Sequence, residues 1–201
     1  MVQSAASQTT PSAEAKAPPP RERILAAASD LFYRHGIRAV GVDAVAEAAG
    51  TNKMTLYRHF ESKDALVAAY LAGLAAESDG HWDALERAYP GDSRAQLMAW
   101  LKEISSHLGG DSRGCALANA AVELPEIDHP ARRVIEANKA AQRDRLAALC
   151  KAAGAREPDL LADEIFLLIE GARISLQSVG PTGPGSRLLA MAERLVRDSF
   201  N

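Results

Sequence analysis

A short segment in the first third of the chain gathers side chains that can hydrogen-bond a nucleic acid. A lysine, a threonine, a tyrosine and a histidine lie within the seven residues 53–59. Ammonium, hydroxyl and imidazole groups donate to phosphate oxygens and to the edges of bases in the DNA grooves. If the segment is helical and exposed, its candidate DNA-contacting residues are Lys53, Met54, Thr55, Tyr57 and His59.

Catalytic and metal chemistry find weaker support. Cys115 and His107 could act as a nucleophile and its base, but no companion motif accompanies them. The two cysteines and five histidines show no zinc-binding spacing, and no glycine-rich phosphate loop follows a strand. We therefore predict no catalytic residue, no metal and no cofactor. The alternative is a helical enzyme or adaptor that uses its first helices only for packing, without sequence-specific DNA binding.

The composition indicates a helical protein that does not span a membrane. Forty of the 201 residues are alanine, which favours helix over strand. Charged residues make up 24%, and no uncharged apolar run approaches the roughly 18 residues of a membrane span. The amino terminus lacks the pattern of a secretory signal, and two cysteines provide no disulfide framework. We expect a cytoplasmic protein with no membrane partner.

Apolar spacing and helix-ending residues predict an all-α fold of about nine helices. Ile24, Ala28, Leu31 and Phe32 form a helical stripe, and Gly36 ends that helix. Serine, asparagine, proline and glycine mark most of the other ends. The expected helices span residues 21–35, 42–49, 53–60, 63–88, 93–108, 115–124, 130–153, 158–179 and 186–200.

The chain divides into three predicted parts. Residues 1–20 are rich in alanine, serine and proline and are expected to be disordered. Residues 21–67 contain seven Lys/Arg against six Asp/Glu, and residues 68–201 contain fifteen against nineteen. This charge distribution fits a DNA-binding domain at 21–67 that precedes an acidic regulatory and dimerisation domain at 68–201.

The second and third predicted helices have the spacing of a helix-turn-helix. In this motif a tight turn holds one helix across another, so that the exposed helix enters the major groove, which is ~12 Å wide. Ala46 provides a small residue at the crossing, Gly50 the turn, and Leu56 an apolar anchor.

Several blocks in the same region agree in order and spacing with one family of regulators. They are RERILAAA at residues 21–28, LF at 31–32, HG at 35–36, VAEAAG at 45–50, TLYRHF at 55–60 and SKDAL at 62–66. These blocks resemble the tetracycline-repressor-like (TetR) family over about residues 21–68. The resemblance implies a homodimeric transcriptional regulator, usually a repressor, which a small-molecule effector releases from a pseudo-palindromic DNA operator.

The resemblance also implies roles for single residues. It places Lys53, Met54 and Thr55 against bases, Tyr57 and His59 against bases or phosphates, and Lys63 against a phosphate. One position departs from the family pattern, because Val40-Gly41 stands where many members have a serine or threonine. A phosphate contact there must come from backbone N–H groups or from Arg38.

The last two predicted helices carry apolar stripes. These stripes form either an intramolecular core or, as the resemblance favours, a four-helix interface between two subunits. The predicted dimer residues are Leu161, Ile165, Leu168, Ala172, Leu176, Leu188, Ala192 and Leu195.

A ligand site is expected between the middle helices. Each candidate could also be an ordinary surface or core residue, and Glu170 and Arg173 could simply pair with each other. The candidate ligand-contacting residues are Trp82, Trp100, His107, Cys115, Asn119, Glu123, Glu170, Arg173 and Gln177.

Overall fold

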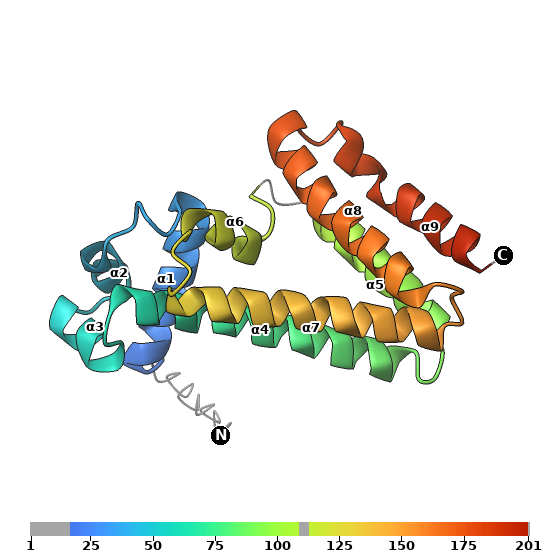
Figure 1. Cartoon of the computed structure of the whole chain (residues 1–201). Helices are drawn as coiled ribbons and strands as arrows, with labels where there is room; N and C mark the ends of the chain where they lie inside the picture. The colour runs from blue at the N-terminus through green and yellow to red at the C-terminus, as the bar shows by residue number, and fades with distance from the viewer. Residues whose placement is uncertain (1–16, 109–112, 201) are drawn as a thin grey trace, which may run out of the picture.

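The structure, a computed structural model, describes residues 17–108 and 113–200. Within these ranges it contains nine α-helices, one 3-10 helix and no strand, so the predicted all-α fold is confirmed. Figure 1 shows α1, α2 and α3 at one end and α5, α8 and α9 toward the other, with α4 and α7 running between the two ends. Of the predicted disordered tail 1–20, residues 1–16 lie outside the described residues.

The helix boundaries follow the predicted ones closely. The helices at residues 63–88, 93–108 and 158–179 begin and end as expected, whereas the last segment is corrected: a 3-10 helix precedes a shorter α9. The elements are α1 (Pro20–His35), α2 (Val42–Ala48), α3 (Lys53–His59), α4 (Lys63–Ala88), α5 (Ser93–Leu108), α6 (Ala116–Glu123), α7 (Pro130–Ala152), α8 (Pro158–Val179), η1 (Pro184–Arg187) and α9 (Leu188–Ser199).

Local chemistry explains these boundaries. The Ser62 hydroxyl accepts a hydrogen bond from the Ala65 backbone N–H at 3.0 Å and caps α4. Pro130 and Pro158 occupy the first turns of α7 and α8, where a missing N–H costs little. Gly36 ends α1 with φ +85°, a conformation that a side chain would strain.

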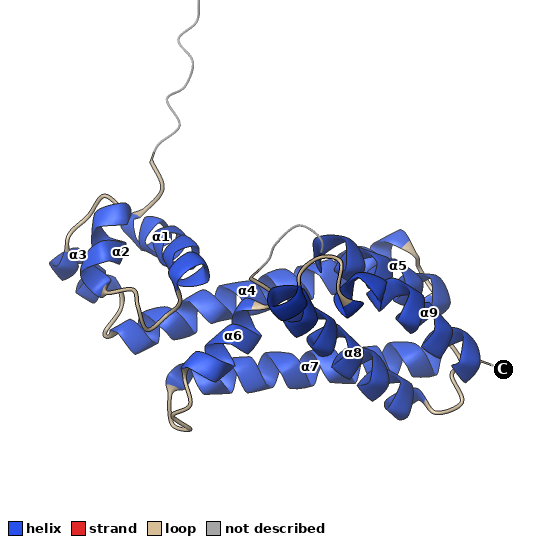
Figure 2. Cartoon of the chain, turned by 90° about the horizontal axis from the view of Figure 1, so that it is seen from above, coloured by secondary structure: helices blue, strands red, loops and turns tan. Residues whose placement is uncertain are grey.

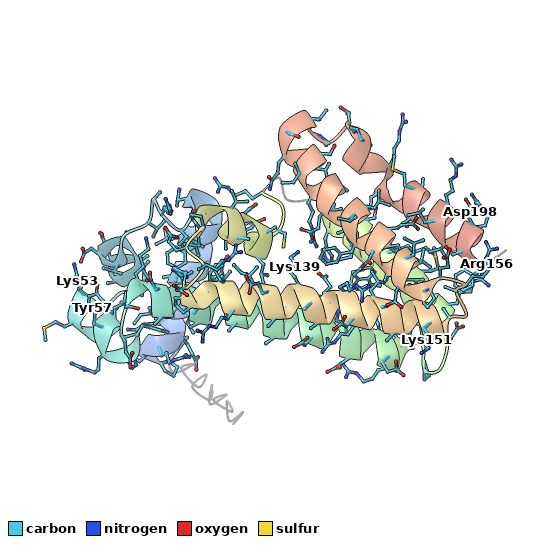
Figure 3. All side chains as sticks on the ribbon, viewed as in Figure 1. Lys53, Tyr57, Lys139, Lys151, Arg156 and Asp198 are labelled. Atoms are coloured by element: carbon cyan, nitrogen blue, oxygen red, sulfur yellow. The ribbon has the colours of Figure 1, made fainter. Side chains whose placement is uncertain are left out.

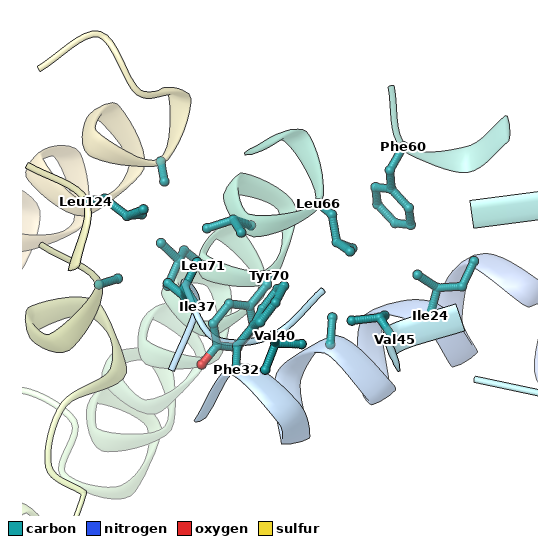
Figure 4. Close-up of a cluster of buried hydrophobic side chains, with 14 of the residues drawn as sticks. Ile24, Phe32, Ile37, Val40, Val45, Phe60, Leu66, Tyr70, Leu71 and Leu124 are labelled. Carbon is teal, nitrogen blue, oxygen red and sulfur yellow. The ribbon is translucent and has the colours of Figure 1, made fainter. Parts of the chain in front are cut away.

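One of the two buried clusters joins the helix-turn-helix to the rest of the chain. It packs Ile24 and Phe32 of α1 and Leu66 and Tyr70 of α4 together with Leu124, which directly follows α6 (Figure 4). The Phe32 and Tyr70 rings lie 5.7 Å apart. The predicted boundary between residues 67 and 68 falls inside α4, and this cluster crosses it. Because the packing is continuous across residues 67 and 68, the division into a DNA-binding and a regulatory domain stays a prediction.

The second cluster corrects the predicted dimer stripe. Here α9 folds back on α8, and α5 and α7 pack against the same layer (Figure 2). Side chains buried in one subunit have no surface left to offer to another. Of the predicted dimer residues, five are buried in this cluster: Leu161, Ile165, Ala172, Leu188 and Ala192. Leu168 and Leu195 are half-buried against them. The eighth predicted residue, Leu176, lies half-buried against the backbone of Gly185. For the five buried residues the structure therefore shows the intramolecular alternative, whereas Leu168, Leu176 and Leu195 keep part of their surface and their place in a subunit interface stays a prediction.

A different face of α8 is apolar and exposed. Leu160, Leu167 and Ile174 follow one another at seven-residue spacing, so they lie on one side of the helix, and Leu167 is 69% exposed. Met191 of α9 is also exposed. In the described part of the chain, no helix is long and apolar enough to cross a membrane.

Candidate nucleic-acid interface

The turn between α2 and α3 sets the angle between these helices. Gly50 has φ +60°, a conformation that glycine adopts freely, and the Thr51 N–H donates to the Ala46 carbonyl at 2.9 Å. Arg23 of α1 donates from Nε to the carbonyl of Ala49 at 3.1 Å. The first helix therefore holds the turn through a side chain–backbone hydrogen bond, and three helices form one unit.

The inner side of α3 is anchored in the core. Leu56 is fully buried, Phe60 packs beside it, and the Arg21 guanidinium lies 5.2 Å from the centre of the Phe60 ring. The Asn52 side chain accepts a hydrogen bond from the Thr55 N–H at 2.9 Å and so caps the helix. This anchoring leaves the other side of α3 free to face a partner.

Most of the predicted DNA-contacting side chains lie on that outer side. Met54 is 77% exposed and Tyr57 is 43% exposed, and Lys53 and His59 are also exposed. Lys53 and Tyr57 lie at the end of the molecule far from α9 (Figure 3). Thr55 is half-buried, so less of its side chain is available. The outer side of α3 therefore presents charged, polar and apolar side chains together.

An ion pair that the sequence did not reveal holds Lys53. Its Nζ atom lies 3.0 Å from Oδ2 of Asp43 on α2, and both side chains are more than half exposed. The hydrogen bond and the charge of Asp43 raise the pKa of Lys53. The two residues are ten positions apart on different helices, and no sequence spacing rule would have paired them. A DNA phosphate must compete with Asp43 for this ammonium group.

Lys63 and Arg38 have different surroundings. Lys63 is half-buried at the start of α4, and burial lowers its pKa although Asp64 and Glu123 oppose the shift. Arg38 donates from Nη2 to Oε1 of Glu126 at 2.7 Å. The guanidinium of Arg38 thus pairs with the loop that follows α6, but both side chains of this ion pair are more than half exposed, so a phosphate contact by Arg38 stays a prediction.

Side chains of the α6–α7 region contact the helix-turn-helix and the start of α4. A Glu123 carboxylate oxygen accepts the backbone N–H of Arg38 at 3.1 Å, just beyond the end of α1. His129, which precedes α7, accepts the Ala131 N–H at Nδ1, and its Nε2 lies 3.4 Å from Oδ1 of Asp64. Side chains from α6 and from the loop before α7 therefore reach both the entry to α2 and the start of α4.

The nine predicted ligand residues do not converge on one pocket. Trp82 and Trp100 stack at 5.0 Å in the second buried cluster, and His107 is exposed at the end of α5. Glu123 contacts the helix-turn-helix, as described above. The nine residues are thus spread over several contacts of the fold, and a ligand site built from them stays a prediction.

A polar cluster does unite most of the remaining candidates. Glu170 accepts hydrogen bonds from Arg173 at 2.6 Å, confirming the predicted pair, and from Lys139 of α7 at 2.8 Å. Lys139 Nζ also lies 3.7 Å from the Cys115 sulfur. The carbonyl of Arg113 accepts from the side chains of Asn119 and Gln177. Lys139 was missed because its sequence surroundings do not distinguish it from a solvated lysine. No group of three or more His, Cys, Asp or Glu side chains in the described ranges could hold a metal ion.

Comparison with known proteins places this geometry among bacterial regulators. A family model described as "Bacterial regulatory proteins, tetR family" matches residues 24–70. The chain is 34% identical over 111 residues to the HTH-type transcriptional activator FasR of Mycolicibacterium smegmatis, a match over 53% of this chain and 49% of FasR. The chain thus spans about half the length of this curated relative.

Two solved structures extend the similarity to almost the whole chain. SCO4454, a TetR-family transcriptional regulator from Streptomyces coelicolor, superposes with a TM-score of 0.84 at 28% identity, over 90% of this chain and 96% of that one. The TetR-type regulator sav143 of Streptomyces avermitilis superposes with a TM-score of 0.72 at 31% identity, over 90% of this chain and 98% of that one. The relatives are named transcriptional regulators and not enzymes.

Proposed function

Because the chain belongs to the TetR family of transcriptional regulators, and so is a DNA-binding regulator, we propose that it is a homodimeric repressor released from its operator by a small molecule. The observation that carries this proposal is the outer side of α3, where Lys53, Met54 and Tyr57 stand exposed on a helix that is anchored from behind by Leu56. A helix held in this way can enter the major groove without rearrangement.

The proposed contacts divide by role. Lys53, Met54 and Thr55, in the first turn of α3, read base edges, and Tyr57 and His59 touch bases or phosphates. Lys63, at the start of α4, binds a phosphate. The exposure of the α3 side chains supports these roles. Because Lys53 is paired with Asp43, its hydrogen bonds to the operator must be stronger than its ion pair with this carboxylate.

We propose that two subunits associate through the outer faces of α8 and α9. Leu160, Leu167 and Ile174 provide an apolar stripe, and Met191 extends it onto α9. A dimer doubles the number of DNA contacts and requires a two-fold symmetric operator. Its half-sites would lie roughly one helical turn apart, ~34–36 Å, or a little more.

The proposed effector acts through the polar cluster of Cys115, Lys139, Glu170 and Arg173. This cluster ties α6, α7 and α8 together, and α6 in turn holds the helix-turn-helix through Glu123. A ligand that binds only one arrangement of these helices shifts DNA affinity by at most its own difference in affinity for the two arrangements.

Repression is proposed because it needs only that the bound dimer blocks a promoter, whereas activation also needs a contact with polymerase. FasR is named an activator, so the test must separate the two. The experiment is a gel shift with DNA upstream of the protein's own coding region, followed by a reporter fused to that DNA. The proposal expects a sequence-specific shift and lower reporter output when the protein is present. Higher output identifies an activator, and no specific shift on any upstream region contradicts the proposal.

A further inference from the structure

The carboxylate of Asp43 is committed to one side chain on the neighbouring helix. Asp43 lies in the first turn of α2, where many aspartates bind backbone N–H groups. In the described part of the chain, however, the only hydrogen bond or ion pair of this carboxylate is with Nζ of Lys53, at 3.0 Å. Its charge is therefore directed across the α2–α3 turn, toward the lysine that the proposed function places against a base.

Both members of this pair are open to a further partner. The Asp43 side chain is 74% exposed and that of Lys53 is 52% exposed, and Lys53 lies at the end of the molecule where Tyr57 also lies (Figure 3). The hydrogen bond between them uses one of the three N–H groups of an ammonium, and a carboxylate has several lone pairs. An exposed pair of this kind exchanges partners at little cost. The pair thus presents donors and acceptors side by side.

A donor and an acceptor at this spacing match the edge of one kind of base pair. In the major groove, guanine presents two adjacent acceptors, N7 and O6, and its cytosine partner presents the N4 amino donor. Guanine O6 and cytosine N4 are hydrogen-bonded to each other, so they lie about 2.9 Å apart. This spacing is close to the 3.0 Å between Nζ of Lys53 and Oδ2 of Asp43. An A·T pair presents its amino donor between two acceptors, so a lysine there meets only one acceptor at a time.

From this match we propose that Asp43 and Lys53 together read one G·C base pair in each half-site of the operator. Lys53 donates to N7 and O6 of the guanine, and Asp43 accepts from N4 of the cytosine, so the ion pair exchanges its partners for one base pair. The inference rests on the proposed function, because it applies only to a chain that binds a specific DNA sequence. It adds α2 to the surface that reads DNA and makes Asp43 a residue that determines specificity.

Asp43 also opposes binding at other sequences. Where the DNA presents no amino group at this place, a Lys53 side chain that turns to the DNA leaves the carboxylate without its cation beside a dense row of phosphate charges. Such an uncompensated charge weakens binding to the wrong sequence, and this repulsion contributes to specificity as much as a new attractive contact does.

Glu47 provides a matched control on the same helix. It follows Asp43 by four residues, so both exposed side chains lie on the same side of α2. Asp43→Ala and Glu47→Ala each remove one carboxylate from this side, so both relieve general repulsion of DNA. Only Asp43→Ala removes the acceptor beside Lys53. Both positions are on the surface, where substitution changes stability little.

The experiment selects binding sites from a random duplex pool with the full chain and with Asp43→Ala, Lys53→Ala and Glu47→Ala. We expect the parent to enrich a G·C pair at one position of each half-site. Asp43→Ala and Lys53→Ala should both lose the preference at that position and keep the others, and Glu47→Ala should enrich the parental sequence. Replacing that G·C pair by A·T in both half-sites should weaken parental binding at least about tenfold in anisotropy titrations, and binding of Asp43→Ala less than about threefold.

The proposal is overturned if Asp43→Ala changes no position of the enriched sequence, or a position other than the one that Lys53→Ala changes. It is also overturned if the shared position is an A·T pair, or if Glu47→Ala causes the same change. In each of these cases the parent still enriches a sequence, so the proposed function stands. A parent that enriches no sequence overturns the proposed function and this inference together.

Discussion

Two lysines of the helix-turn-helix end of the molecule, both proposed to contact DNA, have different surroundings. Lys53 is exposed and paired with Asp43, whereas Lys63 is half-buried and its pKa is lowered by that burial. An exposed ion pair breaks at little cost in free energy, so Lys53 can leave Asp43 and bind a DNA base instead. The half-buried side chain of Lys63 can adopt fewer conformations than an exposed one. Its ammonium group is therefore suited to bind a phosphate at one fixed position.

These surroundings predict different losses in two alanine variants. Lys63→Ala should weaken binding to all DNA and lower the slope of log K against log salt by about one. Lys53→Ala should reduce the preference for operator over random DNA by about tenfold or more, because a base contact is lost. Fluorescence anisotropy over a salt series measures both quantities. Lys102→Ala, an exposed lysine on α5, is the charge control and should change neither. If Lys53→Ala weakened operator and random DNA equally, the lysine would bind phosphate only.

A second pair at residue scale links α7 to α8 and predicts a pH dependence. Arg143 donates to both oxygens of Asp163, at 2.8 and 3.2 Å, and this hydrogen bonding lowers the pKa of the Asp163 carboxyl below its ordinary value. The unfolded chain has an aspartate pKa of about 3.9, so the pair stabilises the fold above that pH. The contribution is lost as the pH falls through about 4 toward the lower folded value.

Asp163→Asn should therefore reduce the loss of stability that the protein shows as the pH falls below about 5. We expect the melting temperature of the variant to fall less than that of the parent between about pH 5 and pH 3. Asp83→Asn removes the same charge from the exposed side of α4 and serves as the control. Equal steepness in Asp163→Asn and the parent would show that the pair contributes nothing to the acid sensitivity.

At the scale of helices, the residues where a helix begins and ends could be predicted from the sequence, whereas the face that each helix exposes could not. Ser62, Pro130 and Pro158 mark helix starts by their own chemistry, and local hydrogen bonds or ring geometry suffice to place them. α8 carries apolar residues on several sides, with Leu160 and Leu161 adjacent in sequence. Its inner face is decided by α5, α7 and α9, which no local pattern specifies. For the same reason, the Asp43–Lys53 and Arg38–Glu126 pairs could not be predicted from local patterns.

The exposed face of α8 leads to a prediction about assembly. Leu167→Glu places a charge at the centre of the proposed subunit interface, where burial without a partner is costly. We expect the dimer dissociation constant to rise at least about tenfold by sedimentation, with an unchanged folded monomer. Ile127→Glu, at an 80% exposed site between α6 and α7, makes the same substitution off this face and should leave the dimer intact. A dimer that survives Leu167→Glu would require a different interface.

At the scale of the whole molecule, the two buried clusters share their long helices. α4 contributes Leu66 and Tyr70 to the cluster around the helix-turn-helix and Leu85 to the cluster around α8, and α7 also joins both. A shift of α4 relative to α5 must therefore move a side chain in each cluster. The Trp82–Trp100 stack joins these two helices, so tryptophan fluorescence should report the shift when an effector binds.

We infer that a symmetric pair of α3 helices reads a specific DNA sequence, and selection from a random duplex pool is the decisive experiment. The purified full chain is used to enrich bound duplexes over several rounds, and the bound fraction is sequenced. We expect one enriched inverted repeat, with half-site centres roughly one helical turn, ~34–36 Å, or a little more apart. No enriched sequence, or a single asymmetric half-site, would contradict it.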